Sequence, residues 1–155
     1  MSFEVEPIVI FSSPEARLQN WKELRKRLAE LDDHSAMELV ADYWSKVPLS
    51  TFSYNPETPE EWLTPWEMVH KGNWCPLMLA VAMEMTLRLS GWDSDRMELI
   101  YFRDYDISEE VFVLKIDGKF ALNYSVGKVV EFPKTKQVLL GSWQFQGRSY
   151  RATTN

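Results

Sequence analysis

The single cysteine, Cys75, is the residue of this sequence best suited to nucleophilic chemistry. It stands directly before Pro76, where a long apolar stretch begins a predicted helix. The free amides and the dipole at a helix N-terminus stabilise a thiolate and lower the pKa of a thiol. Cys75 is therefore a candidate nucleophile. The alternative is a small apolar residue buried at the start of a core helix.

A nucleophilic cysteine is commonly activated by a histidine, and the chain has two histidines. His70 precedes Cys75 by five residues and could fold back against the sulfur to form a non-standard Cys–His pair. His34 follows two aspartates in a predicted turn, where we expect it to be solvated. A carboxylate is a weaker partner, because its negative charge raises the pKa of a nearby thiol.

Two acidic pairs are further candidates for chemistry: Asp104 with Asp106, and Glu109 with Glu110. Paired carboxylates can hydrolyse glycosides or hold a cation. They lie between predicted strands, so the alternative, which we favour, is a solvated rim. No histidines or cysteines stand at metal-ligand spacing and no glycine-rich phosphate loop occurs, so we expect no metal and no other cofactor.

Helices occupy the first part of the predicted fold. Ser12-Ser13-Pro14 begins the first, and Ser35 is the predicted cap of the second, so that the two form a helical hairpin. Thr64-Pro65 begins a short helix that ends near His70. The most apolar helix runs from Pro76 to Ser90 and ends at Gly91, which makes it the central helix.

Strands follow the helices. Alternating apolar residues predict strands at 97–102, 110–116, 120–124, 129–132 and 138–145, with Asp117-Gly118 as a hairpin turn. Residues 1–13 are expected to form a strand or arm, and residues 149–155 a polar tail. The prediction is one α+β domain over residues 1–155, with a helical half at 14–90 and an antiparallel sheet at 97–147.

A segment rich in proline and tryptophan, residues 48–65, interrupts the helical half. Loops of this length in a compact domain are often functional, although they can equally wrap the core. Exposed aromatic side chains are good anchors for a protein partner. The candidate binding residues in and after this loop are Tyr54, Trp62, Trp66 and Trp74.

The stretch from Cys75 to Asn123 resembles the core of papain-like and transglutaminase-like cysteine peptidases. In that fold a cysteine begins the central helix, a histidine stands early in the strand leading to the hairpin, and an Asp or Asn follows the hairpin. The resemblance implies Cys75 as nucleophile and Asn123 as the residue that orients the imidazole. Glu109 stands where the histidine is expected, which implies a degenerate, non-catalytic member of the fold.

A second resemblance concerns origin rather than activity. The runs Tyr43–Pro48 and Thr64–His70, with Trp74-Cys75 and Leu122–Tyr124, resemble proteins of unassigned function encoded by tailed bacteriophages. This resemblance implies a phage-encoded accessory protein, or alternatively a structural or assembly component of the virion.

Charge and composition limit the partners. The net charge of −6 and isoelectric point near 5.0 disfavour binding to duplex nucleic acid. The longest apolar stretch, Pro76–Met83, is shorter than the roughly 20 residues of a membrane span. A lone cysteine and no recognisable signal peptide predict a cytoplasmic location. We expect a protein-interaction domain with a protein partner, the alternative being a hydrolase or acyl transferase that uses Cys75.

Overall fold

The computed structural model describes residues 13–46, 58–71 and 76–153, with backbone alone at 70–71 and 76–77. Helices precede an antiparallel sheet, so the chain has the predicted α+β fold. The helices are α1 (Pro14–Leu28), α2 (Asp33–Ser45), α3 (Pro65–Lys71) and α4 (Pro76–Leu89), with short 3-10 turns η1 (Pro59–Glu61) and η2 (Ser94–Arg96). The strands are β1 (Met97–Asp104), β2 (Glu109–Ile116), β3 (Phe120–Leu122), β4 (Val129–Glu131), β5 (Gln137–Gln146) and β6 (Ser149–Ala152).

Local capping sets where the helices begin. The Ser13 hydroxyl accepts a hydrogen bond from the backbone N–H of Ala16 and starts α1. Helix α2 departs from the prediction, because Asp32 is its cap and accepts a hydrogen bond from the Ser35 N–H. The Asp32 carboxylate, three residues before Ser35, accepts from a free amide of the first turn, so the helix starts three residues earlier than predicted.

The sheet has the strand order β4-β3-β2-β1-β5-β6, and all its pairs are antiparallel. Strands β1 to β4 form the predicted meander. Asp117 and Gly118, in the turn between β2 and β3, both have positive φ, as expected for an Asp-Gly hairpin. Strand β5 does not extend the meander beyond β4, because it returns to pair with β1.

The segment expected to be a polar tail is instead a strand, which corrects the prediction. Residues 149–152 form β6 and pair with the end of β5, with Phe145 opposite Tyr150. Gly147, at φ 66°, makes the tight turn between the two strands. Only Tyr150 has a partly buried side chain in β6, so the backbone ladder rather than an apolar pattern defines this strand.

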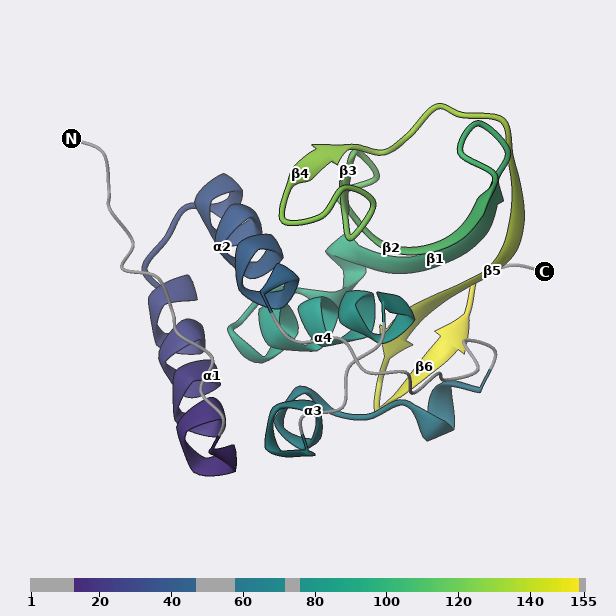
Figure 1. The fold of residues 1–155 in the computed structure, drawn as a ribbon. Coiled ribbons are helices and arrows are strands. Elements are labelled where there is room, and N and C mark those ends of the chain that lie inside the picture. Colours follow the sequence, from purple (N-terminus) through teal and green to yellow (C-terminus); the bar gives the residue numbers. More distant parts are fainter. Residues whose placement is uncertain (1–12, 47–57, 72–75, 154–155) are drawn as a thin grey trace.

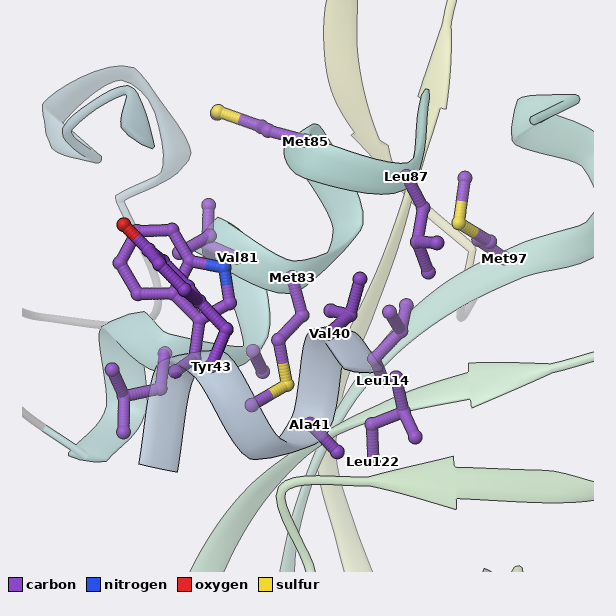
Figure 2. Close-up of a cluster of buried hydrophobic side chains, with 14 of the residues drawn as sticks. Val40, Ala41, Tyr43, Val81, Met83, Met85, Leu87, Met97, Leu114 and Leu122 are labelled. Carbon is purple, nitrogen blue, oxygen red and sulfur yellow. The ribbon is translucent and has the colours of Figure 1, made fainter. Parts of the chain in front are cut away.

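Helix α4 lies between the other helices and the sheet (Figure 1). It packs on β2 and β1 on one side and on α2 and α1 on the other, whereas α1 packs chiefly on α3. Figure 2 shows Met83 of α4 beside Val40 and Ala41 of α2, with Leu114 and Leu122 of the sheet close by. Each such side chain stabilises the fold by about 1.5 to 3 kcal/mol when fully buried. One buried cluster thus joins helices and sheet.

Candidate functional site

A cavity of about 270 Å³ lies where α4 faces β2 and the loop that follows β3. Leu79 and Met83 line it from α4, since residues four apart share one face of a helix. Phe112 contributes from β2. Glu109, Glu110 and Asn123 supply polar groups. The structure therefore brings two of the predicted site residues, Glu109 and Asn123, to one cavity beside the first turns of α4.

Asn123 is held in place by its backbone and its side-chain amide. It follows β3 with φ 71°, a left-handed conformation that asparagine tolerates better than most residues. Its Nδ2 donates a hydrogen bond of 2.9 Å to the carbonyl oxygen of Phe112. This bond holds the Asn123 side chain against β2, which is the strand where the resemblance places a histidine.

Glu110 is held by a neutral donor rather than by a cation. The hydroxyl of Tyr101, on β1, donates to Glu110 Oε2 over 2.7 Å. Tyr101 is buried and its ring stacks on Phe112, with 5.9 Å between ring centroids. The sequence pattern marked Glu110 only as half of an acidic pair, whereas the structure makes it part of the cavity wall.

Other predicted catalytic and binding residues fall wholly or partly outside the described part of the chain. Cys75, Trp74 and Tyr54 lie outside the described residues. His70 belongs to the last turn of α3, and its side chain also lies outside what is described. Four residues, 72–75, connect α3 to α4.

His34 does not belong to this site. It begins α2, where its Nε2 lies 2.7 Å from Glu38 Oε1, and its ring contacts Phe120. Phe120 pairs with Ile116 at the far end of β2 from Glu109. No imidazole lines the cavity among the residues whose side chains the structure describes.

The predicted solvated rim is wrong for Asp104, which has no exposed surface, whereas Asp106 is exposed. The Asp104 carboxylate accepts hydrogen bonds from the Tyr124 hydroxyl (2.6 Å) and the Asp106 N–H (2.9 Å). Burial by itself would raise the pKa of Asp104, but these hydrogen bonds together hold it below its usual value. The hydrogen bond from the Tyr124 hydroxyl to Asp104 raises the pKa of Tyr124 to about 12. Asp104 therefore holds a loop in place rather than forming half of a catalytic pair.

A second cavity, of about 620 Å³, lies between α3, α4 and the β5–β6 hairpin. We call it the Trp66 cavity; Trp66, Arg88, Trp143, Phe145, Arg148 and Tyr150 are among its lining residues. Trp66 is 43% exposed, as expected for an anchor. Trp62 is not an exposed anchor, which corrects the prediction. It is 7% exposed because its indole packs edge-on against Trp143 and Tyr150.

A buried ion pair that sequence reasoning missed lies beside the Trp66 cavity. Glu84, 2% exposed, accepts from Arg88 Nε at 3.0 Å and from the Tyr150 hydroxyl. The partial burial of Arg88 disfavours its charged form, but the contacts to Glu84 prevail and raise the pKa of Arg88. Glu84 and Arg88 stand four apart in an otherwise apolar helix, and this spacing was the signal available in the sequence.

Comparison with known proteins places the fold in a known class. No family model matches the sequence, and no curated protein is similar to it in sequence. Solved structures are similar: calcium-bound LapG of Legionella pneumophila has a TM-score of 0.70 and 16% sequence identity, over 92% of this chain and 81% of that one. The fold is transglutaminase-like.

Two further LapG structures agree with this assignment. One gives a TM-score of 0.67 at 17% identity, over 83% of this chain and 73% of that one. The EGTA-treated form gives 0.64 at 16% identity, over 94% and 88%. Identity this low shows the fold alone and not an activity. Within residues 13–46, 58–71 and 76–153, no three His, Cys, Asp or Glu side chains are grouped to hold a metal ion.

No helix in the described segments is both long and apolar enough to cross a bilayer.

Proposed function

We propose that this domain binds a segment of another protein and does not cleave it. The observation that carries the proposal is the cavity between α4 and β2, whose polar wall consists of Glu109, Glu110 and Asn123. In an active cysteine peptidase an imidazole accepts the thiol proton and forms an ion pair with the thiolate. A carboxylate near Cys75 would act in the opposite sense, because it raises the pKa of a thiol.

Binding is supported by the second cavity. Trp66 is exposed at its edge, and three more aromatic side chains, Trp143, Phe145 and Tyr150, form its walls. Tryptophan and tyrosine are the residues that most often dominate the energy of protein interfaces. A function in a phage or a virion stays an expectation drawn from the sequence resemblance.

The reactivity of Cys75 tests the absence of catalysis. Because Cys75 is the chain's only cysteine, the mass added by iodoacetamide reports on this thiol alone. An unactivated thiol has a pKa of about 8.5, so we expect slow alkylation at about pH 6 and a rate that rises steeply toward pH 8.5. Glu109→Gln should raise the rate near pH 7, since it removes a negative charge.

A hydrolase or acyl transferase that uses Cys75 with His70 is the second candidate. The LapG-like scaffold favours it, as does the position of His70 in the helix that immediately precedes the cysteine. Under this alternative, alkylation is already fast at about pH 6, and His70→Ala slows it by tenfold or more. His34→Ala is the matched control and should leave the rate unchanged. Fast, His70-dependent alkylation would refute the non-catalytic proposal.

A further inference from the structure

The chemistry of the Trp66 cavity indicates which kind of protein segment it accepts. Its volume of about 620 Å³ lies in the range of roughly 300 to 1,000 Å³ typical of ligand sites. Met85 and Leu89 of α4 extend the aromatic walls with aliphatic surface. Such a cavity accommodates an aromatic side chain, which packs against indole and phenol rings in edge-on or offset geometry.

The guanidinium of Arg88 is fixed in one orientation beside these walls. Its Nε is bound to Glu84, its Nη2 donates to the Tyr150 hydroxyl at 3.3 Å, and its plane lies 3.6 Å from the centroid of the Phe145 ring. Within the described part of the chain, Nη1 makes no hydrogen bond. Because the guanidinium is already held in place, binding a ligand through its remaining N–H donors costs little further side-chain entropy.

Arg148 supplies a second positive charge at the same cavity. It lies in the turn between β5 and β6, is exposed, and forms no ion pair with any residue that the structure describes. Glu60, exposed on η1, is the one acidic side chain among the described lining residues. Since Glu84 already balances Arg88, Arg148 is the cation with the greatest capacity to bind an added carboxylate.

We propose that the Trp66 cavity recognises a peptide segment of a partner protein in which an aromatic residue stands next to an acidic one. This inference rests on the proposed binding function. The ring enters the aromatic cavity, and the carboxylate pairs with Arg148, with Arg88 as a second donor. Trp66, which lines the cavity and is 43% exposed, adds apolar surface that a peptide segment can cover.

The overall acidity of the domain does not oppose this pairing. The net charge is −6, but charges on the surface are screened beyond about 8 Å at physiological salt. The groups that a bound carboxylate meets are therefore the local ones: Arg88, which Glu84 balances, and the exposed Arg148 and Glu60. Because Arg148 is exposed to solvent, its pair with a carboxylate should change affinity by up to about fivefold.

A random peptide library selected on the full-length chain provides the test. We expect the recovered peptides to carry an aromatic residue next to Asp or Glu, and Trp66→Ala to weaken their binding in fluorescence anisotropy. Replacing the acid of a selected peptide by its amide should weaken binding by up to about fivefold. Arg148→Gln should weaken binding of the acidic peptide by a similar factor and leave binding of the amide peptide unchanged. The four affinities form a double-mutant cycle that measures the interaction between Arg148 and the acid.

Arg151→Gln is the matched control, because Arg151 is exposed on β6 and does not line the cavity. It should leave both affinities unchanged. Peptides that depend on Trp66 but not on the acid would overturn this inference and leave the binding function standing. The absence of any Trp66-dependent peptide would overturn both. Cleavage of the selected peptides would refute the non-catalytic function alone.

Discussion

Asp104 illustrates at the residue scale how a charged side chain is kept ionised without water. It has no exposed surface, yet Tyr124 and backbone N–H groups donate to both of its oxygens. The ring of Tyr124 stacks on Phe102, which also packs against Phe132 in a small cluster apart from the main core. The carboxylate thereby joins the loop after β1 to the segment after β3.

The depressed pKa of Asp104 predicts a loss of stability in acid. The native carboxyl titrates below its usual value of 3.8, so its stabilisation is complete above about pH 4 to 5 and is lost as the pH falls through the native pKa. Tyr124→Phe removes one donor and brings the native pKa closer to 3.8. We expect the free energy of unfolding of this variant, measured in urea, to be lower than wild type at pH 7.

The difference between the two proteins should shrink as the pH falls below 3.8 and through the native pKa of Asp104, because a protonated carboxyl no longer needs the Tyr124 donor. Tyr105→Phe is the control, since Tyr105 is exposed nearby and does not bind Asp104. A stability difference that stayed constant from about pH 7 to pH 3 would contradict the assigned role of the Tyr124 hydroxyl.

At the scale of the element, α3 depends on a reciprocal cap that presents Trp66 to its cavity. The Thr64 Oγ1 accepts from the Glu67 N–H at 3.3 Å, and Glu67 Oε1 accepts from the Thr64 N–H at 3.1 Å. Helix α3 has seven residues, too few to be stable by itself in water. Its first turn and the direction of Trp66 therefore depend on this capping box.

Thr64→Ala removes the hydroxyl that accepts from the Glu67 N–H and donates to Glu67 Oε1. We expect a loss of about 1 kcal/mol in the free energy of unfolding. Thr64→Ser keeps the hydroxyl and should retain most of the stability. Urea denaturation followed by tryptophan fluorescence measures both variants. Equal stabilities of the serine and alanine variants would show that the cap contributes nothing.

At the scale of the whole molecule, Arg96 connects the helical layer to the sheet. Its guanidinium lies 2.8 Å from Asp33 at the start of α2 and 2.9 Å from Asp117 in the β2–β3 turn. It also lies over the ring of Trp92, 4.2 Å from the centroid. These contacts join three segments that are far apart in the chain, although all of the charges are partly exposed to solvent.

Arg96→Met should lower the free energy of unfolding by only about 1 kcal/mol at neutral pH, because solvent screens exposed pairs. Hydrogen bonding to Arg96 lowers the pKa of Asp117, so this stabilisation is present above pH 3.8 and is lost below it. It should also shrink in about 1 M NaCl. Lys128→Met, which changes net charge equally at a loop position, is the control. A loss unaffected by salt and acid would indicate that packing on Trp92 dominates.

Several elements could be predicted from the sequence because their determinants are local. Ser13 before Pro14 and Thr64 before Pro65 mark helix starts with hydrogen bonds that span three residues. The Asp117-Gly118 turn needs two residues with positive φ, which this pair adopts readily. The apolar helix after Cys75, followed by alternating strands, was enough to indicate a transglutaminase-like fold.

Other features depend on contacts between distant segments, and only the tertiary structure decided them. Trp62 lies in a proline-rich loop that reads as exposed, yet Trp143 and Tyr150, from strands far along the chain, enclose it. Strand β6 has no apolar alternation and exists because the end of β5 offers a free row of backbone groups. Burial and pairing depend on which surfaces meet, whereas a cap or a turn depends on hydrogen bonds within a few residues.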